Sequence, residues 1–249
     1  MLFRSRAAGH IAPSDLIILD LNPGEEAHAY AGLGARLNPS PEVWRDAFTA
    51  IIAVKPQSWR GAAQILDGNL NPNATLISVM AGVRTEDLSS VFAPLKVARV
   101  MPTTGVATGK GVASLYASEG VALQAASDLF SPMAATVVLD NEDLIDAATA
   151  VSGSGPAYVY AFVAALEQAA LETGLTAADA KTLARATLIS AANLLDQTGE
   201  DPEDLIRKVA SPGGTTEAAL KVLRREGQGL TELVTAAVMA AQKRSKELG

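Results

Sequence analysis

The run Ala74-Thr75-Leu76-Ile77-Ser78-Val79-Met80 decides how this chain folds. It is apolar almost throughout, and Ala81-Gly82 follows it as a turn before a helical stretch that Thr85-Glu86-Asp87 opens. A strand that is apolar on both faces needs cover on both sides, which is typical of parallel sheets whose strands alternate with helices. The run therefore predicts a buried strand in a βαβ arrangement.

Similar runs occur on both sides of this one, with helical stretches between them. The chain before it holds Leu16-Ile17-Ile18-Leu19-Asp20 and Ala50-Ile51-Ile52-Ala53-Val54, and the chain after it holds residues 97–101, 112–116 and 135–139. This alternation predicts an α/β, Rossmann-like dinucleotide-binding domain over residues 1–140.

Beyond residue 141 the pattern changes to helices alone. Helical spacing covers residues 143–150, 155–173, 177–196, 202–210, 215–225 and 228–247, with glycines between them. Thr176 is expected to cap one of these helices, with Asp179 three residues further on. We predict an all-α C-terminal domain over residues 141–249.

Residues 156–166 are apolar around nearly the whole circumference of a helix. Such a helix is normally buried on all sides. In a helical domain of this size, that burial is easier to achieve if a second subunit covers the helix. We therefore assign dimerisation to the C-terminal domain and expect a homodimer or a larger homo-oligomer.

The charge balance and residue usage exclude several functions. The 249 residues carry a formal net charge of −7, which argues against nucleic acid as a partner. There is no Cys, and His10 and His28 lack metal-like spacing, so no metal site is expected. No segment has the apolar length of a membrane span or the layout of a signal peptide. We expect a cytoplasmic protein that does not bind membranes.

The front of the expected N-terminal domain is incomplete. Residues 1–8 read as the tail of a helix that ends at Gly9, and the strand and glycine-rich loop that should precede this helix are absent. The absent strand is the central one of the fold, so its two neighbours are expected to lack a partner between them. A start codon assigned too late, a truncated chain and a decayed paralogue are the three explanations, of which we favour the first. Residues that contact the cofactor's diphosphate cannot be named.

Three segments resemble those of pyrroline-5-carboxylate reductases in order and approximate spacing. They are Ala53-Val54-Lys55-Pro56-Gln57, Val151-Ser152-Gly153-Ser154-Gly155-Pro156-Ala157-Tyr158 and Val209-Ala210-Ser211-Pro212-Gly213-Gly214-Thr215-Thr216. The last is similar to the signature of that family. The resemblance implies an enzyme that reduces 1-pyrroline-5-carboxylate to L-proline with NADPH or NADH, the last step of proline biosynthesis.

The signature-like segment offers what a small imine carboxylate needs. Glycines let the backbone approach closely, and the start of a helix favours an anion. The resemblance implies that Thr216 contacts the imine nitrogen as the catalytic residue. It also implies that Ser211, Gly213, Gly214 and Thr215 hold the substrate carboxylate. The Ser154 segment is expected to border the substrate or the nicotinamide, and Ser154 lies near the start of the apolar helix.

The cofactor is expected at the carboxyl edge of the sheet, where ligands bind in this architecture. The resemblance implies contacts from Ala53, Val54, Lys55 and Pro56 after one strand, and from Met101 and Pro102 after another. The family usually has Met-Pro-Asn at the second place, and Thr103 replaces that Asn here. Asp20 followed by Leu21 and Asn22, with no Arg, favours a free ribose hydroxyl and hence NADH.

Other functions stay open. The chain could be a catalytically inactive, truncated paralogue that keeps the dimerisation domain, or a reductase of a related cyclic imine. A β-hydroxyacid dehydrogenase would use a lysine on a helix of the second domain, but Lys181 reads as a solvated surface residue.

Overall fold

The computed structural model describes residues 11–248. The helix expected at residues 1–8 and its stop at Gly9 lie outside this range. The chain forms two compact units: one runs to Gly153 and also includes the chain from Ala241 onward, and the other is Ser154–Ala240. The predicted domain boundary near residue 141 stays a prediction about functional domains.

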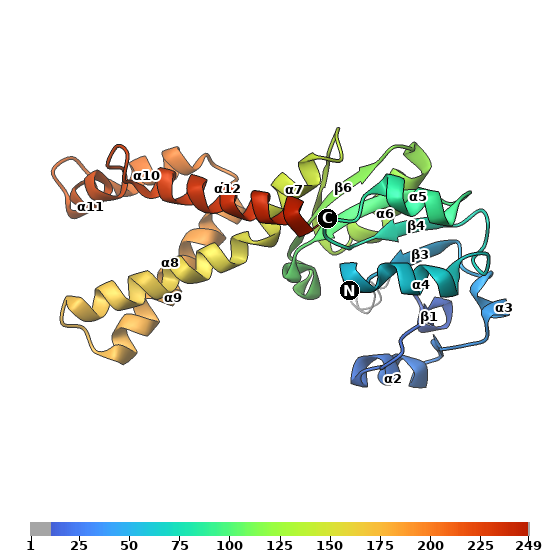
Figure 1. Cartoon of the computed structure of the whole chain (residues 1–249). Coiled ribbons are helices and arrows are strands. Elements are labelled where there is room, and N and C mark those ends of the chain that lie inside the picture. The colour runs from blue at the N-terminus through green and yellow to red at the C-terminus, as the bar shows by residue number, and fades with distance from the viewer. Residues whose placement is uncertain (1–10, 249) are drawn as a thin grey trace. The chain divides into compact units, whose positions relative to one another are not determined.

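A five-stranded sheet forms the centre of the first unit (Figure 1). Its strands, in spatial order, are β3 Thr49–Ile52, β4 Thr75–Ser78, β5 Lys96–Pro102, β6 Gly111–Ala117 and β7 Ala134–Val138. β3, β4 and β5 are parallel, as are β6 and β7, whereas β5 and β6 are antiparallel. The reversal arises because only the short 3-10 helix η3 Thr104–Thr108 joins β5 to β6, and a parallel pair needs a much longer crossover.

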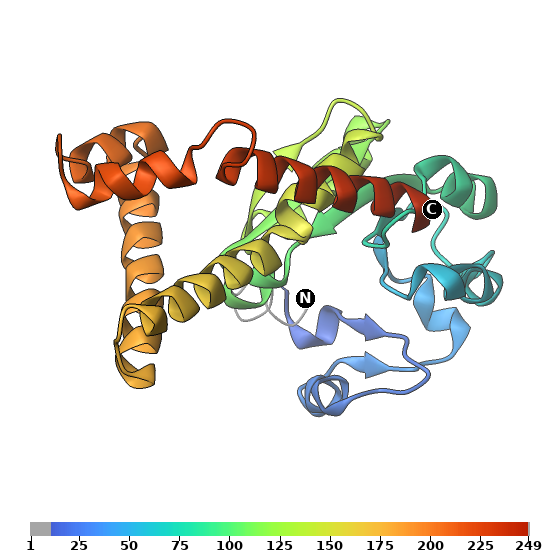
Figure 2. The same cartoon turned by 60° about the vertical axis from the view of Figure 1, so that its left-hand side comes forward.

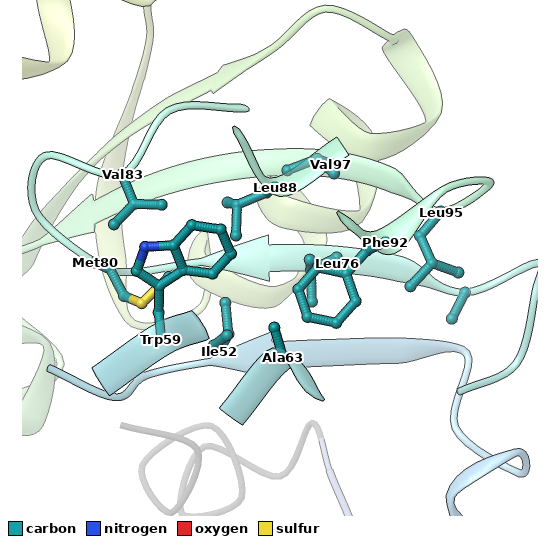
Figure 3. Packing of buried hydrophobic residues seen from close by; sticks show 11 residues of the cluster. Ile52, Trp59, Ala63, Leu76, Met80, Val83, Leu88, Phe92, Leu95 and Val97 are labelled. Carbon is teal, nitrogen blue, oxygen red and sulfur yellow. The ribbon is translucent and has the colours of Figure 1, made fainter. Parts of the chain in front are cut away.

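Helices cover both faces of this sheet, as the apolar runs predict. The 3-10 helix η2 Pro56–Ser58 leads into α4 Trp59–Leu66, which lies with α5 Thr85–Phe92 on one face, and α6 Gly120–Phe130 lies on the other. Neighbouring residues of β4 point to opposite faces. Leu76 packs with Trp59 and Phe92 (Figure 3), while Ile77 belongs to the cluster on the α6 side. The predicted α/β domain is therefore confirmed.

A second, two-stranded parallel sheet precedes the large one. β1 Ile17–Ile18 pairs with β2 Arg36–Leu37, and η1 Pro13–Asp15, α2 Glu25–Gly32 and α3 Pro41–Trp44 surround them. The sequence reading anticipates β1 and α2 but not β2 or α3. Among residues 11–248, β1 and β3 belong to different sheets and are not paired with each other. The expected absence of a strand between them stays a prediction.

Helices alone follow β7, in agreement with the sequence. They are α7 Leu144–Ala148, a π-helical turn Thr149–Gly153, α8 Gly155–Glu172, α9 Ala177–Thr198, α10 Pro202–Val209, α11 Thr215–Leu223 and α12 Leu230–Leu248. Thr176 caps α9, because its Oγ1 accepts a hydrogen bond from the Asp179 amide at 3.2 Å. No helix in the described part of the chain is long and apolar enough to span a membrane.

The apolar helix α8 buries none of its residues within the single chain. It packs against α9, which runs back beside it (Figure 2), yet Tyr160 is 69% exposed and Phe162 is 44% exposed. An apolar surface of this kind is typical of an interface rather than of a solvated face.

Candidate active site

The carboxyl ends of β3, β4 and β5 meet at one edge of the large sheet because these strands are parallel. Ala53, Val54 and Lys55 follow β3 there and are exposed, and Pro56 starts η2. The Lys55 carbonyl accepts the Ser58 amide at 2.9 Å, which closes the turn. Residues Ala53, Val54 and Lys55 are thus exposed at the edge where a dinucleotide is expected.

Asp20 lies just beyond β1, where its backbone is held by a residue that sequence reasoning missed. The Asp20 amide donates to Asn38 Oδ1 at 2.9 Å, and Asn38 Nδ2 donates to the Asp20 carbonyl at 2.8 Å. Asn38 follows β2 and has φ 46°, a left-handed conformation that Asn adopts more readily than most residues. Asp20 Oδ1 accepts the Asn22 amide at 2.9 Å, and Oδ2 has no hydrogen bond to a described residue. One oxygen therefore remains available to a ribose hydroxyl.

Met101 and Pro102 end β5, and Thr103 fixes the turn that follows. The Thr103 amide donates to the Val112 carbonyl at 2.8 Å, and Thr103 Oγ1 accepts the Val112 amide at 3.0 Å. The Thr103 hydroxyl thus stabilises the connection between β5 and β6. Thr103 therefore has a structural function in this turn.

The turn from Ser211 to Gly214 leads directly into α11, with Gly214 at the N-cap position. Gly213 has φ 71°, which favours glycine. A Cβ added to Gly214 would lie 2.5 Å from Ser211 Oγ and 3.0 Å from the Ser211 carbonyl oxygen, so any larger residue would force this turn apart. The glycines are therefore required by the shape of the turn.

Glu217 accepts a hydrogen bond from one of the backbone amides of this turn. This contact was not predicted from the sequence. The Gly213 amide donates to Glu217 Oε2 at 2.5 Å, and Lys221 Nζ lies 3.0 Å from Glu217 Oε1. These two contacts, the Gly213 amide first, lower the pKa of Glu217. The spacing of Glu217 at the third helical position is the capping-box spacing, which could have revealed the contact.

The donors that remain lie at Thr215 and Thr216. The Gly214 amide donates to the Ser211 carbonyl at 3.0 Å, so both glycine amides are engaged within the loop. Thr215 and Thr216 are the first two residues of α11, whose amides have no acceptor inside the helix. Two amides and two hydroxyls at a positive helix end can receive a carboxylate.

Ser154 is the N-cap residue of α8, but its hydroxyl makes no capping hydrogen bond. The turn before it is π-helical: Thr149 Oγ1 donates to the Ile145 carbonyl at 2.7 Å, and Ser152 Oγ donates to the Ala148 carbonyl at 2.8 Å. Side-chain bonds of this type compete with the helical backbone pattern, and π-helical turns are frequent near functional sites.

A buried ion pair lies elsewhere in the first unit and was also missed. Arg99 Nη1 donates to Glu142 Oε1 at 2.8 Å, and Glu142 also accepts the Thr85 amide at 2.8 Å and the Thr85 hydroxyl at 2.7 Å. Burial raises the pKa of Glu142, but the hydrogen bonds from Thr85 and Arg99 outweigh it, so the pKa is lowered overall. An arginine inside an apolar strand is itself a sequence signal, because it requires a buried partner.

The predicted site residues thus form two groups. Asp20, Asn22, Met101, Pro102 and the segment Ala53–Pro56 belong to the first unit, and Ser154 with the turn Ser211–Thr216 belongs to the second.

A Rossmann-like sheet with an exposed segment at its carboxyl edge, followed by a helical region, is an architecture that nucleotide-dependent oxidoreductases use. The match to a family of known proteins is specific within that class. Residues 142–248 match the family model for pyrroline-5-carboxylate reductase dimerisation. The pyrroline-5-carboxylate reductase of Pseudomonas aeruginosa is 36% identical over 211 residues, which cover 83% of this chain and 77% of the relative. That of Synechocystis is 34% identical over 253 residues, covering 100% and 93%.

Solved structures give the same result. The pyrroline-5-carboxylate reductase of Coxiella burnetii superposes with a TM-score of 0.87 at 28% identity, covering 100% of this chain and 93% of that one. The Plasmodium falciparum pyrroline carboxylate reductase, a structure with NADP bound, superposes with a TM-score of 0.81 at 25% identity, covering 99% and 92%. This chain belongs to the pyrroline-5-carboxylate reductase family.

Proposed function

We propose that this protein reduces 1-pyrroline-5-carboxylate to L-proline with NADPH or NADH. The observation that carries the proposal is the Ser211–Thr216 turn, which leaves the first amides and hydroxyls of α11 available beside two glycine amides that are already engaged. Because the chain belongs to the pyrroline-5-carboxylate reductase family, we assign 1-pyrroline-5-carboxylate as the ligand of that turn. The reaction adds a hydride to the imine carbon and a proton to the imine nitrogen, so the nicotinamide is oxidised as the ring is reduced.

The cofactor, when bound, supplies the hydride. Ala53, Val54, Lys55 and Pro56 would hold it through their backbone at the sheet edge, together with Met101 and Pro102. Asp20 Oδ2 would accept a ribose hydroxyl, and Asn22 supports Asp20 from the other oxygen. With an acid and no arginine at this place, we propose a preference for NADH over NADPH.

The substrate carboxylate is received by Thr215 and by the amides at the start of α11. Thr216 is the catalytic residue: its hydroxyl contacts the imine nitrogen and orients the ring while nitrogen gains its proton. Gly213, Gly214 and Ser211 shape the turn. Ser154 borders the substrate from the start of α8.

We further propose a homodimer, or a larger assembly built from it. The exposed apolar residues of α8 and α9 support this, because a second copy would remove them from water. The match of residues 142–248 to a dimerisation family model supports it as well. A cytoplasmic location stays a prediction.

The direct test supplies 1-pyrroline-5-carboxylate to the purified protein with NADH or NADPH and follows cofactor oxidation. Its ring-expanded, six-membered homologue serves as the comparison substrate. Faster turnover of the five-membered imine supports the proposal, and faster turnover of the six-membered imine would assign the enzyme to another cyclic imine.

A second candidate function is favoured by one observation. Among residues 11–248, β1 and β3 each have one edge that pairs with no strand, and the second candidate is a protein that assembles without catalysing a reaction. Calorimetric titration with NADH and NADPH separates the two. Dimerisation without any dinucleotide binding would favour the assembly function.

A further inference from the structure

A polar cavity of about 260 Å³ lies in the first unit. The residues around it come from the loop after β4, from β5, from α7 and the loop before it, and from the end of α12. They are Gly82, Arg84, Arg99, Asp143, Asp146, Ser245 and Lys246. Ser245 Oγ donates to Asp146 Oδ1 at 2.6 Å, which holds the end of α12 beside α7.

Arg99 brings an unsatisfied donor to this cavity. Its side chain is only 4% exposed, and Nη1 is used by Glu142. Nη2 is buried and has no hydrogen-bond partner within the described part of the chain. A buried guanidinium nitrogen without an acceptor is costly, so this nitrogen points to a ligand atom with a lone pair.

Among the charged side chains around the cavity, one basic and one acidic group form no salt bridge with a described residue. Arg99 pairs with Glu142, and Arg84 Nη1 lies 2.8 Å from Asp143 Oδ1. Lys246 forms no salt bridge with a described residue. Asp146 accepts the Ser245 hydroxyl and has no cation of a described residue within salt-bridge distance, although the charge of Arg84 acts on it from further away.

We propose that this cavity binds a small α-amino acid in its zwitterionic form. The carboxylate accepts hydrogen bonds from Arg99 Nη2 and Lys246, and the ammonium group lies against Asp146. A simple anion would face the carboxylates of Asp143 and Asp146, and a simple cation would face three basic side chains. The zwitterion alone satisfies every group that the protein leaves unpaired.

The cavity has the size for such a ligand. Liquid water occupies about 30 Å³ a molecule, so the volume exceeds that of several waters and admits an amino acid with a small side chain. The inference does not depend on the proposed reductase activity, because none of these residues belongs to the cofactor or substrate segments described above.

Glycine and acetate make a matched pair of probes, since they differ only by the ammonium group. Saturation-transfer NMR on the full chain, without cofactor or imine, measures the affinity for each. We expect glycine to bind more tightly than acetate. Lys246→Ala should weaken glycine binding about tenfold, the loss of one charge-assisted hydrogen bond. Lys243→Ala, an exposed lysine of the same helix outside the cavity, should leave it unchanged.

Asp146→Asn gives the second arm of the test. Asn can still accept the Ser245 hydroxyl, so the cavity keeps its wall while it loses the charge that attracts ammonium. We expect this variant to prefer acetate over glycine, the reverse of the wild type. Equal binding of the two probes by the wild type, or equal glycine affinities in the Lys246 and Lys243 variants, would overturn the proposal. Neither result would bear on reductase activity, which is assayed separately.

Discussion

Arg99 Nη1 donates to Glu142 Oε1 at 2.8 Å, with only 4% of the arginine and 7% of the glutamate side chain exposed. Because Glu142 also accepts the amide and hydroxyl of Thr85, this one carboxylate joins the middle of β5, the start of α5 and the segment before α7. Among the described contacts of the first unit, it connects three elements that are far apart in sequence.

Removing the charge of Glu142 should therefore destabilise the protein strongly. Glu142→Gln keeps acceptors for Thr85 but leaves the Arg99 guanidinium without a buried countercharge. We expect a loss of about 3 kcal/mol or more in the free energy of unfolding, measured by urea denaturation. Asp143→Asn is the control, because the Arg84–Asp143 pair is exposed and should contribute at most about 1 kcal/mol. Equal losses in the two variants would refute a special function of the buried pair.

The same carboxylate predicts how stability depends on pH. The folded protein lowers the pKa of Glu142 below its ordinary value of 4.5, so the unfolded chain takes up this proton first as the pH falls. The contribution of Glu142 is thus fully present above that ordinary pKa and is lost as the pH falls through the lower, folded pKa. Between about pH 6 and about pH 3, wild type should lose more stability than Glu142→Gln. Parallel pH profiles for the two proteins would contradict this assignment.

Thr216 provides a test of the proposed catalytic contact. Thr216→Val removes the hydroxyl and keeps the shape, and we expect kcat/KM for the imine to fall about 10- to 100-fold, the loss of one hydrogen bond to a charged or developing charged group. Thr216→Ser keeps the hydroxyl and should retain most of the activity. If the Ser and Val variants lose activity equally, the hydroxyl is not the functional group.

Glu217 predicts an effect in the opposite direction. Its carboxylate occupies the Gly213 amide beside the place assigned to the substrate carboxylate, so the two negative charges compete. Glu217→Gln should lower KM for the imine, and Glu226→Gln, an exposed acid beyond the end of α11, should not. Steady-state kinetics at low ionic strength measures both. A raised KM in the Glu217 variant would show that this carboxylate supports binding instead.

Most of the fold could be predicted because the central strands β4 and β5 are buried on both faces. The run around Leu76 and Ile77 is apolar throughout, and this pattern locates a central strand without further information. β2 could not be predicted in this way, because Arg36–Leu37 is short and half-buried and has no periodicity. The antiparallel pairing of β5 and β6 follows from the short connection between them. The pattern of apolar residues does not predict this pairing.

The site could be predicted at the level of segments but not of contacts. Ser211–Thr216 reads as an anion-binding helix start from its glycines and hydroxyls alone. Glu217 accepts the Gly213 amide, and Asn38 binds the backbone of Asp20. Both contacts depend on the side-chain conformations, which residue spacing does not determine. Arg99 and Glu142 are 43 residues apart, and only the tertiary structure brings them together.

The central claim is hydride transfer from the nicotinamide to the imine carbon of 1-pyrroline-5-carboxylate. Its most direct measurement uses NADH or NADPH that carries deuterium at the transferred position of the nicotinamide, followed by mass spectrometry and NMR of the product. We predict L-proline with one deuterium on the ring carbon next to nitrogen and away from the carboxylate, in a yield equal to the cofactor oxidised. Proline without deuterium at that carbon, or no proline at all, would contradict the account.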